Sequence, residues 1–191
     1  MANVKVTKRA SNIEYAIRDV IVHTKDLIKN GKKIYYLNIG DPAAFDFKTP
    51  PSLKEALCNA IAKEDNYYSP SEGLPELRQA VANKEKKINN VDISPDDVLV
   101  TEGISEGIQM LLGAIVEKGD EILFPGPTYP PYISYTKFFD GKPVSYETIE
   151  KEGWQPNIDD LRSKITEKTR AIVIINPNNP TGSVYDRNTI K

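Results

Sequence analysis

The chain has 191 residues, of which 39% are hydrophobic and 27% are charged, and its formal net charge at pH 7 is −2. These proportions are typical of a globular protein with a hydrophobic core, and they exclude a disordered chain. No apolar run approaches the roughly 18 residues of a membrane span, so we expect a cytoplasmic protein without a membrane partner. The lysines are scattered among acidic residues, and this pattern argues against a nucleic-acid partner.

The counts of cysteine and histidine restrict the possible chemistry further. Cys58 is the only cysteine and His23 is the only histidine. A disulfide framework, a Cys/His zinc site and a Ser-His-Asp triad built from this chain alone are therefore excluded. We expect His23 on the surface of a helix and Cys58 on the apolar face of another, as a small core residue.

The first predicted element is a helix over residues 13–30. Asn12 can cap it, its isoleucines repeat at helical spacing, and Gly31 follows at a position that favours a left-handed residue. Residues 34–39 then predict a short strand, which leads into the turn-prone segment Gly40-Asp41-Pro42.

Two further helices are predicted before residue 98. Ser52 and Glu55 have the spacing of a capping box ahead of a helix over residues 53–63. Pro75 is expected to be the first residue of the next helix, because proline lacks the N–H that the first turn leaves unpaired.

From Val98 onward, short apolar strands alternate with helices at intervals of about 20 to 30 residues. The unbroken apolar run 171–175 predicts a central strand that is buried on both faces, as in parallel sheets. The predicted fold class is therefore α/β, with a mostly parallel sheet and helices on both faces. The expected strands are residues 98–100, 122–124, 143–146 and 171–175.

In an open α/β sheet, ligands bind beyond the carboxyl ends of the strands, so the loops after these strands are the candidate sites. Gly103, Ile104 and Ser105 follow residues 98–100 and begin a predicted helix. Backbone N–H groups and the helix dipole favour an anion there, and Ser105 adds a hydroxyl donor. The same residues could equally do no more than cap the helix, and they form neither a GxGxxG fingerprint nor a P-loop.

Two proline-containing loops follow later strands. The segment Gly126-Pro-Thr-Tyr-Pro-Pro-Tyr132 restricts the backbone around Tyr129 and can present its ring to a ligand. The segment Asn176-Pro-Asn-Asn-Pro-Thr-Gly182 holds asparagine amides that can donate hydrogen bonds to a ring oxygen. Taken singly, each loop could also be an ordinary turn.

Taken together, these segments resemble the class I aminotransferases, which are pyridoxal-phosphate (PLP)-dependent enzymes of fold type I. The resemblance is carried by Asn176–Gly182 and by Tyr68-Ser-Pro-Ser-Glu-Gly-Leu-Pro-Glu-Leu-Arg78. It extends over the whole chain, from Asn38-Ile-Gly-Asp-Pro42 through Gly126–Tyr132, and is strongest to alanine aminotransferases. It implies two parts, with residues 1–45 forming the N-terminal arm, a helix and the start of the small domain. Residues 46–191 would form the N-terminal part of the large PLP-binding domain.

The resemblance implies a role in cofactor binding for five residues. Gly103, Ile104 and Ser105 match the turn that binds the PLP phosphate, and Ile104 occupies a variable position that contributes its backbone alone. Tyr129 matches the aromatic residue that stacks on the pyridine ring. Asn179 matches the asparagine that hydrogen-bonds the phenolic oxygen of PLP, beside the substrate.

Two further residues are assigned by the same resemblance. Gly40 matches a glycine whose backbone lies close to the substrate carboxylate. Tyr68 matches a tyrosine that reaches the phosphate of the neighbouring subunit's cofactor, so the resemblance implies a homodimer with shared active sites. No metal is implied.

The resemblance implies transfer of an amino group between an amino acid of alanine or aspartate type and a 2-oxo acid such as 2-oxoglutarate. The lysine that carries PLP as a Schiff base, the aspartate that pairs with the pyridinium nitrogen and the carboxylate-binding arginine all match positions beyond Lys191. We therefore assign no catalytic residue and expect an inactive N-terminal part of a protein roughly twice as long. Two alternatives are a non-catalytic regulatory or binding module and a PLP-dependent lyase on the same fold.

Overall fold

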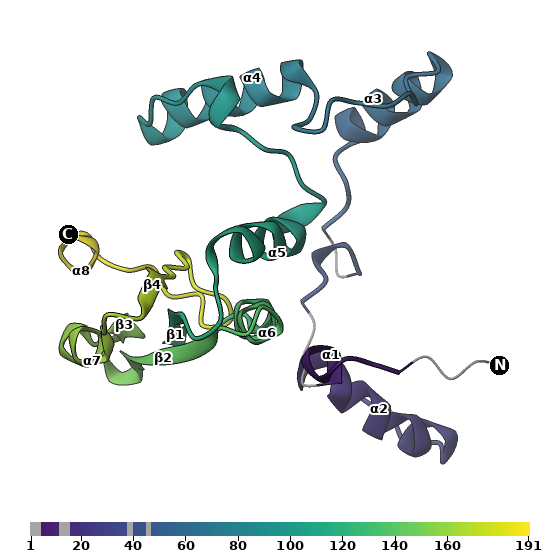
Figure 1. The fold of residues 1–191 in the computed structure, drawn as a ribbon. Helices are drawn as coiled ribbons and strands as arrows, with labels where there is room; N and C mark the ends of the chain where they lie inside the picture. The colour runs from purple at the N-terminus through teal and green to yellow at the C-terminus, as the bar shows by residue number, and fades with distance from the viewer. Residues whose placement is uncertain (1–4, 12–15, 38–39, 45–46) are drawn as a thin grey trace. The chain divides into compact units, whose positions relative to one another are not determined.

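The structure is a computed structural model that describes residues 5–11, 16–37, 40–44 and 47–191 (Figure 1). The chain forms two compact units. One contains residues Met1–Lys33 and Gly103–Lys191, and the other contains residues Ile34–Glu102. The division into domains after residue 45, which the resemblance implies for a complete enzyme, stays a prediction.

The first unit begins with two helices, α1 (Lys8–Ser11) and α2 (Ala16–Lys29). Helix α2 confirms the predicted first helix, whereas the single turn α1 was not predicted. The expected cap, Asn12, lies outside the described residues, as does the side chain of His23.

The end of α2 is the glycine-terminated turn that the sequence predicts. Gly31 has φ +75°, in the left-handed region. Its N–H donates to the carbonyl of Ile28 at 2.9 Å, and the N–H of Lys32 donates to the carbonyl of Leu27 at 3.0 Å. This pair of bonds is a Schellman motif, which satisfies carbonyls that the helix end would leave unpaired.

The described residues of the first unit form a four-stranded sheet in the order β3-β2-β1-β4. β1 pairs in parallel with β2 and β4, and β3 pairs antiparallel with β2, so the predicted mostly parallel sheet is confirmed. The strands are β1 (Glu121–Gly126), β2 (Lys142–Ile149), β3 (Gln155–Pro156) and β4 (Thr169–Ile172). The helices of this part are α5 (Gly103–Ile115), α6 (Pro130–Phe138), η4 (Glu150–Glu152), α7 (Ile158–Lys164) and α8 (Arg187–Ile190).

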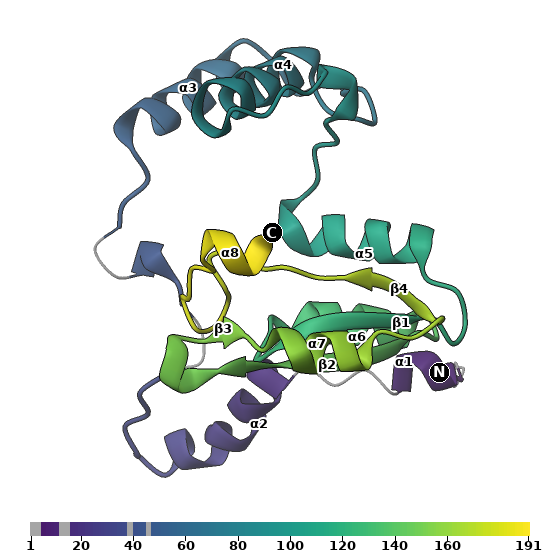
Figure 2. The same cartoon turned by 90° about the vertical axis from the view of Figure 1, so that its left-hand side faces the viewer.

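Helices cover both faces of the sheet, as predicted. The chain runs from β1 through α6 to β2, and then returns past β1 to β4 through α7. Because both connections are expected to be right-handed, this reversal puts α6 and α7 on opposite faces. Figure 1 shows the two helices on opposite sides of β1 and β2, and in Figure 2, viewed from the side of α7, both overlap these strands.

The core of this unit lies between α5, α6 and β1. Ile108 and Leu112 of α5, with Val116 just after the helix, recur every four residues and pack against Ile122 and Phe124, which point to the same side of β1. Each such side chain contributes about 1.5–3 kcal/mol by leaving water, which makes this cluster the main stabilising feature of the unit. The core therefore fixes the start of α5 relative to the carboxyl end of β1.

The predicted central strand 171–175 is wrong in position and length. β4 ends at Ile172 and lies at the edge of the sheet, whereas β1 is the buried central strand. Ala171 and Val173 face the core, but Ile172 and Ile174 are 41% and 54% exposed. The apolar run indicates a strand that can be covered on both faces, and the described residues cover one of them.

Hydrogen bonds nevertheless hold the chain beyond β4. The N–H of Val173 donates to the carbonyl of Leu123 at 2.8 Å. The hydroxyl of Tyr146, from β2, donates to the carbonyl of Val173 at 2.9 Å. Burial raises the pKa of Tyr146, and the neighbouring Tyr185 raises that pKa further.

The second unit is helical. Its elements are η1 (Pro42–Ala44), α3 (Pro51–Ala62), α4 (Pro75–Lys84), the π-helical turn η2 (Glu85–Asn89) and η3 (Pro95–Asp97). Pro75 is the first residue of α4, as predicted. Residues 34–37 and 98–100 form no strand, which corrects both predictions; residues 38 and 39 lie outside the described part.

The start of α3 and the position of Cys58 also differ from prediction. Pro50 is the N-cap of α3 and makes no side-chain cap, so the expected capping box of Ser52 and Glu55 does not form. Pro51, whose φ is already helical, starts the helix earlier than predicted. Cys58 is exposed rather than in a core.

The segment after α4 is held by one arginine. The Arg78 Nε donates to the carbonyls of Pro95 and Val98, at 2.9 and 3.1 Å, and Nη2 donates to Asp96 Oδ1 at 2.9 Å. This arginine ends the Tyr68–Arg78 segment, so its role here is to tie α4 to η3. Among the described residues, no helix is long and apolar enough to cross a membrane.

Candidate functional site

The start of α5 is the first part of the candidate site. Gly103 has φ +73°, a left-handed conformation that a residue with a side chain adopts only at a cost. The helix begins there, so the positive end of the helix dipole lies at this turn. Ile104 is exposed, and its role stays a prediction.

The structure brings Ser105 and Tyr129 together. The Ser105 Oγ lies 3.2 Å from the Tyr129 hydroxyl oxygen, and either group can donate the hydrogen bond. Both residues are partly buried. A helix N-terminus, a serine hydroxyl and an aromatic ring therefore meet at one place, beside the carboxyl end of β1.

The Tyr129 ring is held by its neighbours. Tyr129 is the N-cap residue of α6, and the prolines that follow it occupy the first turn of that helix. Its ring meets that of Tyr132 edge to face, with centroids 6.4 Å apart, and Tyr132 in turn contacts Phe124. Such aromatic pairs add about 0.5–1.5 kcal/mol beyond their buried area, so the ring is a fixed platform.

The three asparagines of the loop 176–182 have different roles. Asn176 Oδ1 accepts a hydrogen bond from the N–H of Tyr185 at 3.0 Å. Asn178 is buried, and its Nδ2 donates to Thr181 Oγ1 at 2.9 Å and to the carbonyl of Pro127 at 3.3 Å. Asn179 is exposed, which leaves its amide accessible to a ligand.

Two buried polar atoms at the site have no hydrogen-bond partner within the described part of the chain. They are Thr128 Oγ1, beside Tyr129, and Asn178 Oδ1, beside Asn179. Buried polar groups are normally paired, because an unpaired one costs about 1–3 kcal/mol. The turn and the asparagine loop therefore keep hydrogen-bonding capacity for a bound molecule.

Gly40 and Tyr68 belong to the unit Ile34–Glu102. Both are exposed, and no atom lies within 4 Å of the position of a Cβ at Gly40. Their relation to Ser105 and Tyr129 stays a prediction. Asn38, which precedes Gly40 in the motif, lies outside the described residues.

Residues 32–191 match the family model described as aminotransferase class I and II. The chain belongs to this family. An alanine aminotransferase of Mycobacterium tuberculosis is 40% identical over 93% of the chain, and the glutamate–pyruvate aminotransferase of Escherichia coli is 36% identical over 98%. Among solved structures, an alanine aminotransferase from Pyrococcus furiosus is 56% identical over 97% of the chain, with a TM-score of 0.94.

The chain spans about half the length of these aminotransferases. The matched part is 42% of the Mycobacterium tuberculosis protein, 46% of the Escherichia coli protein and 47% of the Pyrococcus furiosus chain. An aspartate aminotransferase of Thermus thermophilus, 33% identical with a TM-score of 0.90, is matched over 49% of its chain. The α/β fold and the family are thus established for this half.

Aminotransferases of this family are typically PLP-dependent, and the residues present fit that cofactor. A phosphate suits the helix start at Gly103 with the adjacent Ser105 hydroxyl, and a flat ring suits the platform of Tyr129. The unpaired Thr128 Oγ1 and Asn178 Oδ1 are consistent with a polar ligand.

Two residues that hold the site were not predicted. Thr148 Oγ1 donates to the carbonyl of Gly126 at 2.7 Å, and Asn178 donates to that of Pro127. Threonine is common in strands, and an asparagine in a turn usually hydrogen-bonds locally, so a single sequence contains no signal for either contact.

Proposed function

We propose that this chain is the cofactor-binding half of a PLP-dependent aminotransferase. The complete protein transfers an amino group between an amino acid of alanine or aspartate type and a 2-oxo acid such as 2-oxoglutarate. The observation that carries this proposal is the contact of Ser105 with Tyr129 at the start of α5. The likeness to alanine and aspartate aminotransferases supports the substrate class.

The chain's own residues bind and orient the cofactor. The N–H groups at the start of α5 and the Ser105 hydroxyl donate to the phosphate, where the positive end of the helix dipole adds to the attraction. Tyr129 packs against one face of the ring and keeps water from that face. Asn179 donates its amide to the ring oxygen. When bound, PLP supplies an electron sink for bond cleavage at the amino-acid Cα.

The remaining assignments concern the substrate and the second subunit. The backbone at Gly40 lies beside the substrate carboxylate, where the absence of a side chain allows close approach. Tyr68 donates its hydroxyl to the cofactor phosphate of the neighbouring subunit. The active form is accordingly a homodimer whose sites are each built from both copies.

Amino-group transfer by the complete protein tests the proposal. With PLP, alanine and 2-oxoglutarate, we expect pyruvate and glutamate to form in equal amounts. A regulatory module would bind PLP or an amino acid without forming either product. A lyase would consume the amino acid without any 2-oxo acid present. Either result would contradict the proposal.

The 191-residue chain provides a second test. No lysine in it matches the family's PLP-binding lysine, so we expect no amino-group transfer and only scattered, substoichiometric labelling after borohydride reduction with PLP. Without that lysine no group is placed to move the Cα proton, a step for which acid–base help is worth about 10²–10⁴-fold. Peptide mapping identifies the labelled residues. One lysine labelled to completion, together with turnover, would overturn this expectation.

A further inference from the structure

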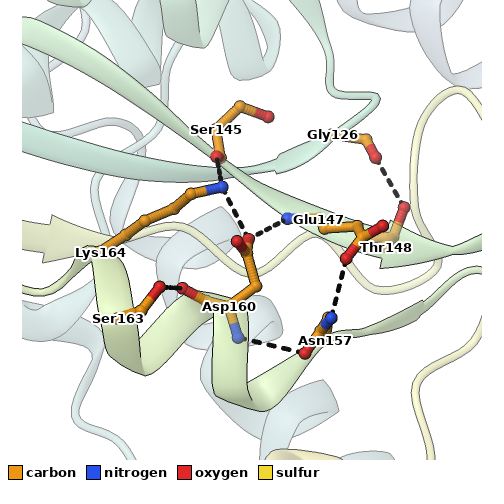
Figure 3. Close-up of polar contacts among 8 residues, drawn as sticks. All are labelled: Gly126, Ser145, Glu147, Thr148, Asn157, Asp160, Ser163 and Lys164. Atoms are coloured by element: carbon orange, nitrogen blue, oxygen red, sulfur yellow. Dashed lines mark hydrogen bonds and ion pairs between the residues drawn. The ribbon is translucent and has the colours of Figure 1, made fainter.

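Two buried side chains hold the turn that carries Tyr129. β1 ends at Gly126, and the carbonyls of Gly126 and Pro127 are the two backbone acceptors just before Thr128 and Tyr129. Thr148 Oγ1 donates to the first of these carbonyls at 2.7 Å, as Figure 3 shows. Asn178 Nδ2 donates to the second at 3.3 Å.

The two donors are themselves fixed. Thr148 is 6% exposed and pairs with Pro156 in the antiparallel ladder of β2 and β3. Asn178 is 4% exposed, its N–H donates to the carbonyl of Ser183 at 2.8 Å, and its own carbonyl accepts from the N–H of Gly182 at 2.8 Å. Each donor therefore belongs to a different, internally bonded part of the unit, one in β2 and one in the asparagine loop.

The turn is also pressed closely against β2. A Cβ at Gly126 would lie 2.4 Å from the Ser145 Oγ and 3.3 Å from the carbonyl oxygen of Tyr146. A Cβ there would force the Ser145 hydroxyl to rotate away and would crowd the carbonyl of Tyr146, so glycine allows the turn to lie close to the strand. The path of the backbone into Tyr129 is thus set by β2, through Thr148 and close packing, and by Asn178 of the asparagine loop.

The position of this turn decides where the Tyr129 ring lies. Tyr129 follows Pro127 by two residues, and its hydroxyl is 3.2 Å from the Ser105 Oγ. A shift of the turn by a fraction of an ångström would change both the plane of the ring and its distance from the start of α5. Sites held by packed and hydrogen-bonded supports keep the geometry that binding requires.

We propose that Thr148 and Asn178 are positioning residues for the cofactor-binding Tyr129. The expected effect of these two residues on PLP binding rests on the proposed function. The two side chains act through the carbonyls of Gly126 and Pro127. They connect β2 and the asparagine loop to the turn that carries Tyr129. Tyr129, Ser105 and Asn179 therefore keep fixed positions relative to one another.

The first test needs no cofactor. Thr148→Val removes the hydroxyl and keeps the shape of the side chain, whereas Thr148→Ser keeps the hydroxyl. In the 191-residue chain, amide hydrogen exchange at Thr128 and Tyr129 should become about three- to tenfold faster in Thr148→Val and stay near wild type in Thr148→Ser. Asn178→Asp, which replaces the amide donor by a carboxylate, should accelerate exchange at the same amides.

Thr136→Val is the matched control for these variants. Thr136 is a buried threonine of the same unit, but its hydroxyl donates to the carbonyl of Tyr132 within α6. This variant should leave exchange at Thr128 and Tyr129 unchanged. Equal acceleration by Thr136→Val and Thr148→Val would mean general loosening of the core and would overturn the proposal.

The second test uses the complete protein and PLP. Thr148→Val should weaken PLP binding about three- to tenfold, and Thr148→Ser should restore it. If the wild-type protein binds PLP and Thr148→Val changes neither amide exchange at the turn nor PLP affinity, the inference is overturned. Faster exchange at the turn in a protein that binds no PLP would support the two contacts and refute the proposed function instead.

Discussion

The hydroxyl oxygens of Ser105 and Tyr129 lie 3.2 Å apart, although the residues are separated by 24 positions in the sequence. One hydroxyl donates to the other, and the acceptor keeps its own proton for a further partner. An anion at the start of α5 would accept a hydrogen bond from that remaining O–H, so the pair is suited to bind a phosphate.

Replacing Ser105 by alanine should weaken PLP binding in the complete protein. One lost hydrogen bond to a charged group costs about 1.5–3 kcal/mol, which corresponds to a rise in the Kd of about 10- to 100-fold. Tyr129→Phe is the matched comparison, because it keeps the ring and removes only the neighbouring hydroxyl, and it should raise the Kd less. An unchanged Kd in Ser105→Ala would refute the assignment of the phosphate site.

Tyr68 should act across the dimer interface. Two inactive complete variants, Tyr68→Ala and one lacking the PLP-binding lysine, should regain part of the activity when mixed, because each hybrid dimer then contains one site with both residues. Tyr67→Ala provides a control, since Tyr67 is exposed and adjacent. That variant should be active without mixing. Verified hybrid dimers that remain inactive would count against a shared site.

Arg78→Lys should destabilise the unit Ile34–Glu102. The side chain of Arg78 is 14% exposed, and a lysine ammonium cannot reproduce its fork of donors to the carbonyls of Pro95 and Val98. We expect a loss of about 1.5–3 kcal/mol, seen as faster hydrogen exchange at residues 95–100.

Lys86→Met is the control for Arg78→Lys. It removes an exposed ion pair with Asp92 in the same unit and should change stability by less than about 1 kcal/mol. If the two variants behave alike, Arg78 does not tie α4 to η3.

Asp160 should make the unit that contains the sheet sensitive to acid. Its carboxylate accepts from Lys164 Nζ at 2.7 Å and from the N–H of Glu147 at 2.7 Å (Figure 3), and these bonds, Lys164 first, lower the pKa of Asp160. A lowered pKa in the folded state means that the stabilisation is present above the unfolded value of about 4. It is lost as the pH falls through the folded pKa.

Urea denaturation between pH 7 and pH 2 measures this dependence. Asp160→Asn should be less stable than wild type at pH 7, and the difference should shrink as the pH falls. Asp159→Asn changes the same charge at an exposed neighbouring position of α7. A difference between Asp160→Asn and wild type that does not vary with pH would exclude this carboxylate as the titrating group.

Much of the fold follows from local patterns. The helix ending at Gly31 and the start of α4 at Pro75 follow from spacing and backbone preference, which act within one element. The capping box at Ser52 failed because Pro51 competes for the same helix start. The apolar run 171–175 was assigned to the centre of the sheet, but strand order depends on contacts between distant segments.

The residues of the candidate site were also predictable only in part, because some of their contacts join distant segments. The loop rule for α/β sheets led to Tyr129, which follows β1. It led to Ser105 through a strand predicted at residues 98–100 that does not form, yet the structure places the two side chains in contact. Thr148 was not predicted, because its contact with Gly126 depends on the register of β1 against β2. The roles of Asn176, Asn178 and Asn179 depend on which side-chain amide the loop buries. Composition alone does not predict which one that is.

The hydroxyl bond from Tyr146 to Val173 exists only while the phenol keeps its proton. An ordinary tyrosine ionises at about pH 10. Because burial raises the pKa of Tyr146, this bond persists at higher pH. In an alkaline titration followed by phenolate absorbance, Tyr146 should ionise late and together with release of the chain beyond β4. The chain beyond β4 is thus fastened by a bond that alkali breaks, in contrast to the acid-sensitive bonds of Asp160.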